Sequence, residues 1–187
     1  METEKTDRRT DHRRGGLTLR PLLQRDFSAW YKSYSSRHLS QHRHDEGQLD
    51  MSVCTDEWFA GILARHRQLA EEDRSYVYGV FHENGRHLGA VDFSTLDRDY
   101  QWGRIGYQIH NQYWGRGFGF QALQNALHIG FTELDYHRIE AHINVDNVAS
   151  IRTAERVGMQ YECTRERFIY EFGEWTDNLV YYLNRIY

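Results

Sequence analysis

Hydrophobic and polar positions along the chain follow a helical spacing in some segments and alternate with a period of two in others. Regular structure is expected to begin at Leu17, where LTLRPL alternates in the manner of a strand. The segments 24–35 and 56–70 then place apolar side chains at helical spacing, which predicts two amphipathic helices. The buried stripe of the second helix is expected to consist of Phe59, Ile62, Leu63 and Leu69.

The pattern changes to a period of two in the middle of the chain, where three strands are expected. The runs 75–82 and 87–94 are apolar and alternating, and Asn84-Gly85 lies between them. Asn-Gly is a strong hairpin signal because both central residues of such a turn adopt positive φ. A third strand is expected at 100–110, so these segments together predict an antiparallel meander.

A glycine-rich turn at 115–119 precedes a long amphipathic helix and then an alternating strand at 139–145. The buried face of the helix is expected to contain Phe120, Leu123, Leu127, Phe131 and Leu134. In the strand, one face carries Ile139, Ala141, Ile143 and Val145, and the other carries Glu140, His142 and Asn144.

The C-terminal part predicts a short helix at 148–157 and two strands at 161–172 and 175–183. Asn147 suits the N-cap of the short helix, and Gly158 suits the position after its end. The whole order is therefore a strand, two helices, a three-stranded meander, a helix, a strand, a helix and two strands. This order predicts one α/β (α+β) domain.

Length and composition agree with a single folded domain. The chain has 187 residues, of which 40% are hydrophobic and 14% aromatic, so it can bury a sizeable core. Residues 1–16 (METEKTDRRTDHRRGG) carry charges of both signs and end in Gly-Gly. We expect a disordered charged tail at 1–16 and the domain at 17–187.

Charge and cysteine content exclude several classes of function. The formal net charge of −4 gives no electrostatic reason to bind nucleic acid or an anionic membrane. No apolar run reaches the length of a membrane span, and the N-terminus lacks the apolar stretch of a signal peptide. Cys54 and Cys163 are too few for a disulfide framework or a metal site. A cytoplasmic protein is therefore expected.

Eleven histidines invite a metal hypothesis, but they are scattered along the chain. His38, His42 and His44 lie close together in a polar segment that reads as a loop. A solvated histidine-rich loop explains this segment better than a metal site, and no metal is expected.

The glycine-rich turn, Trp114-Gly115-Arg116-Gly117-Phe118-Gly119, is the strongest chemical signal in the chain. Glycines between a strand and a helix allow backbone N–H groups to surround an anion at the positive end of the helix dipole. A diphosphate is the expected anion. The dinucleotide pattern fails because Phe120 stands where its third glycine is needed, and the Gly-Lys-Ser/Thr of a P-loop is missing.

The stretch IGYQIHNQYWGRGFGFQALQNALHIGF resembles the acetyl-CoA signature of the GNAT superfamily, specifically its RimJ/RimL-like branch. The segments HRIEAHINVDNVASIRTAERVGM and GEWTDNLVYYL resemble two further motifs of that branch, in the same order. The resemblance covers about residues 17–183. It implies a mixed central sheet of about seven strands with helices on both faces, in which two strands splay apart around acetyl-CoA.

The resemblance also implies a set of cofactor-binding residues. The backbone at 107–110 would flank the thioester, with an N–H near Ile109 polarising its carbonyl. The glycine turn would hold the diphosphate, and the helix that follows Asn147 would bind the pantetheine arm. The implied set is Tyr107, Gln108, Ile109, His110, Gly115, Arg116, Gly117, Phe118, Gly119, Asn147 and Ser150.

The catalytic residues are less clearly indicated. Many GNAT enzymes protonate the departing thiolate with a tyrosine, but Ala154 stands at that position here, which leaves Ser150 as the candidate acid. Glu140 and His142, on the polar face of their strand, are candidate bases, with His110 behind them. Each of the three base candidates is equally compatible with a polar lining that only binds substrate.

A primary amine is the expected acceptor. An α-amino group has a pKa of about 7.7–8.0 and a lysine amine one of about 10.4, so a weak catalytic apparatus favours an α-amine such as a protein N-terminus. The alternatives are a small-molecule amine (a polyamine, amino acid or antibiotic) and an acyl-CoA-binding module without turnover. The sequence is equally compatible with a monomer and a homodimer.

Overall fold

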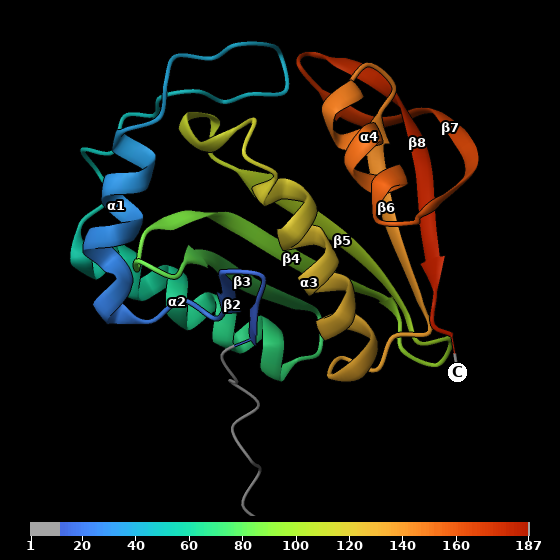
Figure 1. Cartoon of the computed structure of the whole chain (residues 1–187), viewed down its shortest axis with the longest axis horizontal. Helices are drawn as coiled ribbons and strands as arrows, with labels where there is room; N and C mark the ends of the chain where they lie inside the picture. Colours follow the sequence, from blue (N-terminus) through green and yellow to red (C-terminus); the bar gives the residue numbers. More distant parts are fainter. Residues whose placement is uncertain (1–11, 187) are drawn as a thin grey trace, which may run out of the picture.

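The computed structural model describes residues 12–186, which form one eight-stranded mixed sheet with helices on both faces. Helices α1 and α2 cover one face, and α3 and α4 cover the other (Figure 1). The helices are α1 (Phe27–Ser35), α2 (Asp56–Glu71), α3 (Phe118–Thr132) and α4 (Val148–Arg156), with 3-10 turns at Gln24–Asp26 and Asn111–Tyr113. The expected α/β fold is confirmed.

The strands lie in the order β1-β2-β3-β4-β5-β6-β8-β7, and all neighbours are antiparallel except β5 and β6. Their bounds are β1 His12–Arg14, β2 Leu17–Arg20, β3 Ser75–His82, β4 His87–Asp97, β5 Trp102–Ile109, β6 Arg138–Asn144, β7 Gln160–Glu171 and β8 Glu174–Asn184. Each predicted strand and helix corresponds to one of these elements.

Strand β1 lies within the segment for which we expected disorder. It pairs with β2 through a hairpin at Gly15 and Gly16, whose φ angles are 61° and 81°. Glycine adopts positive φ readily, so this Gly-Gly pair forms a tight turn between two strands. A Gly-Gly pair in a sequence can thus indicate a tight turn as well as a flexible leader. The expected tail is therefore ordered in its last part, whereas residues 1–11 lie outside the described residues.

Helix α3 packs against the sheet through small residues as well as through the predicted leucines. Ala122, Leu123, Ala126 and Leu127 are buried, whereas Phe120 is only half-buried. Gly130 also faces the sheet, and a Cβ placed there would lie 2.5 Å from the side chain of Ile139. Small residues on this face let the helix lie close to the strands that carry the site.

The two hairpin turns β3–β4 and β7–β8 differ from each other in their φ angles. In the β3–β4 turn only Gly85 has positive φ, so the Asn84-Gly85 pair does not form the two-residue turn that its sequence suggests. The β7–β8 turn does have that geometry, at Phe172 (φ 56°) and Gly173 (φ 82°). A phenylalanine in the left-handed region is unusual, and this one lies beside the cleft described below.

Candidate active site

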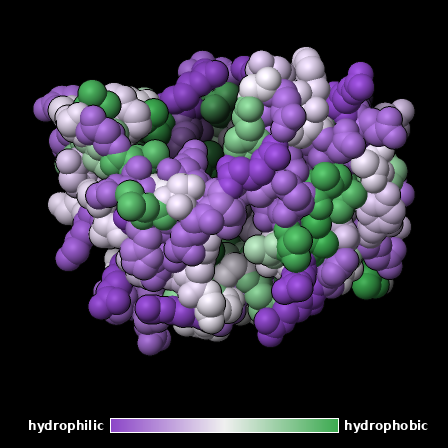
Figure 2. All heavy atoms as spheres, turned by 90° about the horizontal axis from the view of Figure 1, so that it is seen from above, coloured by the Kyte–Doolittle hydropathy of each residue, from purple (hydrophilic) through white to green (hydrophobic). Residues whose placement is uncertain are grey.

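The parallel strands β5 and β6 pair over only three residues, from Trp102 and Arg138 to Arg104 and Glu140. Beyond that point they part, and a cavity of about 500 Å³ lies between them. Figure 2 views the molecule from above and shows a hollow in a mainly hydrophilic surface. Residues lining the cavity include Arg43, Glu46, Tyr107, Gln108, Ala141, His142, Asn144, Asn147, Ser150, Glu171 and Phe172. The expected splay of the two strands is confirmed.

The backbone of β5 presents hydrogen-bonding groups to this gap. The N–H of His110 donates to the Leu88 carbonyl at 2.9 Å, so His110 points its backbone toward β4. Because backbone groups alternate between the two edges of a strand, the N–H of Ile109 points the other way, toward the gap. The Ile109 carbonyl accepts a hydrogen bond of 2.6 Å from the indole of Trp114, which ties the glycine turn to the end of β5.

The glycine turn ends at Gly117, which adopts the left-handed conformation (φ 78°) and caps the 15-residue helix α3. A Cβ at Gly115, Gly117 or Gly119 would meet no atom within 4 Å, so the space in front of this backbone is open. Arg116 is exposed beside it. An open cradle of N–H groups at the positive end of a helix is suited to bind a diphosphate.

Helix α4 begins with its predicted cap, because the Asn147 side chain accepts from the N–H of Ser150 at 3.2 Å. The Ser150 carbonyl accepts from the Tyr107 hydroxyl at 3.0 Å, which joins α4 to β5 across the cleft. Ser150 lines the cavity, whereas Ala154, one turn later, is fully buried.

Glu140 and His142 form a hydrogen-bonded pair on the polar face of β6. The Glu140 carboxylate lies 3.0 Å from His142 Nε2 and 2.9 Å from the Arg138 guanidinium. Burial raises the pKa of Glu140, but the hydrogen bonds from His142 and Arg138 outweigh burial and hold this pKa below its usual range. An ionised carboxylate requires a proton on the nitrogen that faces it, so Nε2 of His142 carries the hydrogen.

This pairing leaves Nδ1 of His142 with a lone pair. Nδ1 is buried and has no hydrogen-bond partner among the described residues, and His142 lines the cavity. Burial lowers the pKa of His142, although Glu140 partly opposes that change. At neutral pH His142 is therefore an uncharged base. Glu140 itself is almost fully buried and does not line the cavity, so it positions His142.

The imidazole of His110 lies elsewhere. It is fully buried against α1, with Nδ1 3.1 Å from the Ser33 carbonyl, and its ring packs on Tyr34 and His87. His110 does not line the cavity, and its backbone N–H is bound to Leu88 on the side of β4, so the residue is unsuited to act as the base. Its pKa is lowered to about 4 because burial disfavours the charged form.

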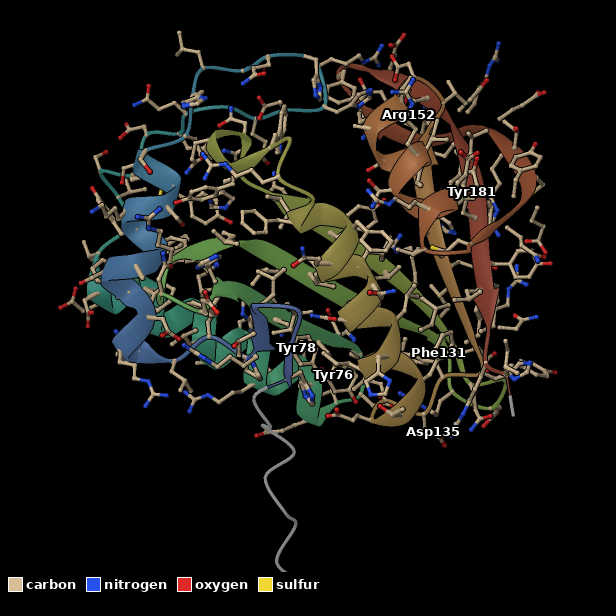
Figure 3. The ribbon with its side chains drawn as sticks, viewed as in Figure 1. Tyr76, Tyr78, Phe131, Asp135, Arg152 and Tyr181 are labelled. Carbon is tan, nitrogen blue, oxygen red and sulfur yellow. The ribbon has the colours of Figure 1, made fainter. Side chains whose placement is uncertain are left out.

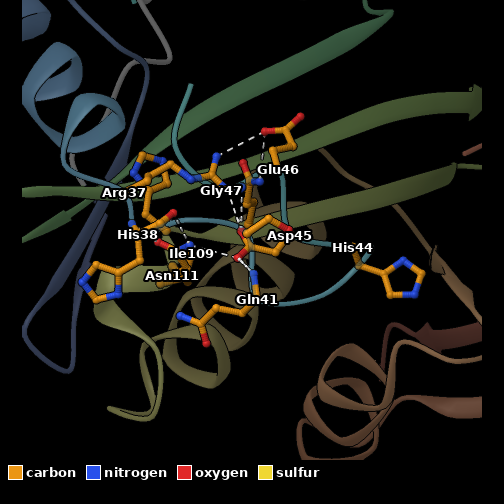
Figure 4. Close-up of polar contacts among 12 residues, drawn as sticks. Arg37, His38, Gln41, His44, Asp45, Glu46, Gly47, Ile109 and Asn111 are labelled. Carbon is orange, nitrogen blue, oxygen red and sulfur yellow. Dashed lines mark hydrogen bonds and ion pairs between the residues drawn. The ribbon is translucent and has the colours of Figure 1, made fainter. Parts of the chain in front are cut away.

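The loop between α1 and α2 crosses over the cleft. A buried ion pair of 3.0 Å between Arg37 and Asp45 anchors it (Figure 4). Asn111, next to the glycine turn, donates to Asp45 at 2.9 Å and to the His38 carbonyl at 2.9 Å. This anchor places the next residue, Glu46, at the cavity wall. We call residues 38–47 the strap.

The tip of the strap reaches the opposite side of the cleft. His44 pairs with Asp146, at the end of β6, and its ring packs edge-on against Phe172. Arg43 contacts Glu174 at 3.1 Å and lies over the Phe172 ring. The segment is a loop, as expected, with His38 and His42 exposed, and through Arg43 and His44 it also bridges two walls of the site.

The structure thus places the predicted residues in two groups. Tyr107, Gln108, His142, Asn147 and Ser150 meet at one cavity, and the glycine turn adjoins them at the end of β5. Sequence reasoning missed the contributions of the strap and of the β7–β8 turn. Their only signal was a run of charged and histidine residues without periodicity, which indicates a loop but not where the loop lies.

A second cavity, of about 810 Å³, lies at the opposite end of the sheet. Its lining includes Tyr76 and Tyr78 on β3 and Asp135 after α3, which Figure 3 shows far from Arg152 on α4. Asp135 is paired with Arg185, and Tyr76 donates to Asp73. None of the residues predicted to bind cofactor or to react lines it.

Within residues 12–186 no group of three or more histidine, cysteine, aspartate or glutamate side chains is placed to hold a metal ion. No helix in this range is both long and apolar enough to cross a membrane.

Comparison with known proteins identifies the family. The sequence profile of the acetyltransferase (GNAT) domain matches residues 16–160. The chain is 26% identical over 168 residues to the uncharacterized N-acetyltransferase YoaA of Bacillus subtilis, covering 88% of this chain and 91% of the relative.

Solved structures share the fold at lower identity. The ribosomal-protein-S5-alanine acetyltransferase of Vibrio fischeri has a TM-score of 0.75 at 17% identity, covering 94% of this chain and 96% of its own. The spermidine N-acetyltransferase of Vibrio cholerae, solved with CoA and spermine, has a TM-score of 0.70 at 18% identity and covers 91% and 96%. With the profile match spanning most of the chain, the protein belongs to the GNAT family of N-acetyltransferases.

Proposed function

We propose that the protein transfers the acetyl group of acetyl-CoA to a primary amine in the cleft between β5 and β6, most favourably to the α-amine of a protein or peptide N-terminus. The main support for the proposal is that β5 and β6 separate at this cleft, with a free backbone edge on β5 and the buried, uncharged His142 on β6. The two walls supply different chemistry. One offers hydrogen-bond donors to a carbonyl oxygen, and the other offers a base.

The cofactor residues fit acetyl-CoA. The open glycine cradle suits its diphosphate, and the free edge of β5 suits the amide groups of the pantetheine arm, which pair with backbone like an added strand. The N–H of Ile109 is directed toward the thioester carbonyl in this arrangement. When bound, acetyl-CoA supplies the acetyl group as an activated thioester.

The reaction requires two proton movements. The amine nitrogen forms a bond to the acetyl carbon, the carbon–sulfur bond breaks, one proton leaves the nitrogen, and the thiolate takes up one proton. His142 Nδ1 accepts the proton from the amine, with Glu140 holding the ring in the required tautomer. The Ser150 hydroxyl gives its proton to the thiolate from the α4 side.

The low basicity of His142 supports the α-amine acceptor. Burial lowers its pKa below the ordinary value of 6.5, so it takes a proton poorly from a strongly basic amine. An α-amine is already neutral on the order of a tenth of the time at pH 7, whereas a lysine amine is neutral far less often. A weak base therefore suffices for an N-terminal amine.

A polyamine is the second candidate acceptor. Glu46 and Glu171 both line the cavity, and carboxylates favour acceptors that carry several positive charges. A spermidine acetyltransferase is also among the structural neighbours. The pairing of His142 with Glu140 in the cleft argues against a module without turnover.

A panel of peptides and small amines, assayed for release of free CoA thiol from acetyl-CoA, tests the proposal. We expect turnover with peptides that have a free N-terminus and none with the same peptides blocked at that end. Turnover with polyamines alone would replace the α-amine proposal. Binding of acetyl-CoA in calorimetry without turnover on any amine would contradict the proposed reaction, and absence of binding at millimolar ligand would contradict the site itself.

A further inference from the structure

We infer that Glu46, on the strap, is the carboxylate that binds the positively charged acceptor amine beside the reacting thioester. The inference rests on the proposed function and names a residue that determines specificity within the same cleft. In this arrangement the strap recognises the ammonium group of the acceptor amine.

The positive charges near Glu46 do not fully neutralise its carboxylate. Arg37 lies between two carboxylates, 3.0 Å from Asp45 and 3.2 Å from Glu46. Asp45 is fully buried and also accepts hydrogen bonds from Asn111 and from the N–H groups of Gln41 and Gly47, which keep its pKa low despite its burial. The single charge of Arg37 is therefore balanced by Asp45, and the negative charge of Glu46 remains available at the cavity wall.

The contacts of Glu46 place that charge next to the cofactor strand. Oε2 of Glu46 accepts from Arg37 and lies 3.5 Å from the Gln108 side-chain nitrogen on β5. Oε1 has no hydrogen-bond donor among residues 12–186. Gln108 precedes Ile109, whose N–H faces the gap, so the free carboxylate oxygen lies close to the expected position of the thioester.

The other charged groups of the cavity are already paired or face other partners. Arg43 is bound by Asp146 and Glu174, and Glu171 accepts from Asn144 and Thr176. Both donors reach Glu171 Oε1, so Oε2 of Glu171, like Oε1 of Glu46, has no hydrogen-bond donor among residues 12–186. Glu46 differs from Glu171 in its contact with Gln108, which places its carboxylate beside the cofactor strand β5.

His142 independently indicates that a ligand binds in the cavity lined by Glu46. Its side chain is 95% buried and lines the same cavity, yet Nδ1 has no partner among the described residues. An amine bound in this cavity would supply a donor for that nitrogen.

Steady-state kinetics of Glu46→Gln test the inference, with an acceptor found in the amine panel. The substitution keeps the shape and removes the charge. We expect the KM for the amine to rise by between about tenfold and a hundredfold, the range for a lost hydrogen bond to a charged group. The KM for acetyl-CoA should stay within about twofold, because Glu46 acts on the acceptor side.

Two controls separate charge from structure. Glu83→Gln makes the same chemical change on the exposed β3–β4 turn and should leave both KM values unchanged. In the unaltered protein the KM for the amine should rise with salt, and in Glu46→Gln it should depend on salt less, because salt screens attraction between exposed charges.

The outcomes distinguish this inference from the proposed function. Wild-type turnover with an unchanged amine KM in Glu46→Gln would overturn the role of Glu46 and leave the proposed function standing. An equal rise in both KM values, or a wild-type amine KM that does not respond to salt, would overturn it as well. Failure of the wild type to acetylate any amine would overturn the proposed function and, with it, this inference.

Discussion

Two polar side chains face the cleft from opposite walls, Ser150 from the first turn of α4 and His142 from the polar face of β6. Ala154, at the position where the resemblance implies a tyrosine in many GNAT enzymes, is fully buried and adds no polar group. At the scale of residues, the proposed reaction therefore depends on a weak acid and on a base of lowered pKa.

Ser150→Ala tests the acid. If the Ser150 hydroxyl protonates the thiolate, its loss should lower kcat by about 10²–10⁴-fold, with little change in the KM for acetyl-CoA. The N–H of Ser150 still donates to Asn147, so the helix cap survives the substitution. A thermal melt should confirm an unchanged fold. A near-normal kcat in the folded variant would show that the thiolate takes its proton from water.

His142→Gln tests the base. The variant keeps a polar side chain near Glu140 but has no ring nitrogen that accepts a proton, so kcat/KM should fall by about 10²–10⁴-fold. His128→Gln, on the exposed side of α3, is the matched control and should retain full activity. Equal activity of the two variants would limit His142 to a lining role.

At the scale of elements, the site depends on two turns with positive φ that come from distant parts of the sequence. Gly117 begins α3, and Phe172 joins β7 to β8. Each turn holds backbone or side-chain groups at the cleft in a conformation that most residues avoid.

Gly117→Val adds a branched side chain to the open space in front of the α3 N-terminus. We expect the affinity for CoA to fall in calorimetry, because the side chain occupies the space of the diphosphate. Gly85→Val is the matched control, since Gly85 has a similar φ (82°) and equally open surroundings on the β3–β4 turn. The control should lose similar stability and keep CoA affinity. Unchanged affinity in Gly117→Val would place the diphosphate elsewhere.

Phe172→Asn should stabilise the protein and weaken its function. Asparagine tolerates the left-handed region, so relief of the strain at φ 56° should raise the free energy of unfolding by about 1 kcal/mol. The same change removes the ring contacts to Arg43 and His44 that hold the strap, so the KM for the amine should rise. Denaturant unfolding and kinetics measure the two effects. Lower stability with an unchanged KM would contradict both.

At the scale of the whole molecule, two buried histidines link stability to pH. His87 and His110 lie side by side between α1 and the sheet, and Nε2 of each lacks a partner among the described residues. Burial lowers the pKa of His87 to about 3 and that of His110 to about 4. In the unfolded chain both should titrate near 6.5.

The unfolded state therefore binds more protons than the folded state between pH 6.5 and about 4. Stability should be fully present above pH 6.5 and fall as the pH decreases through this window, by about 1.4 kcal/mol per pH unit for each fully titrating histidine. His87→Gln should show a shallower decrease in unfolding free energy between pH 7 and pH 5 than the wild type. An identical pH dependence would assign the acid sensitivity to other groups.

Much of the fold was predictable because periodicity reports which face of an element is buried. The strand with Glu140 and His142 on its polar face was predicted at 139–145 and is observed at Arg138–Asn144, and Asn147 caps α4 as expected. The order of the elements after residue 17 was also correct. The β1 hairpin was missed because charged residues followed by Gly-Gly fit a leader as well as a turn.

The sequence by itself determined the elements after residue 17, the glycine turn and the family, since these depend on local spacing and local backbone freedom. Only the tertiary structure decided which polar groups share the cleft. The strap, the Phe172 turn and His142 meet there because β5 and β6 part after three residue pairs, and Glu140 lies buried behind His142. Burial also separated His110, whose ring packs against α1, from His142, which lines the cavity. Proximity between distant segments is a property of packing, and local pattern does not encode it.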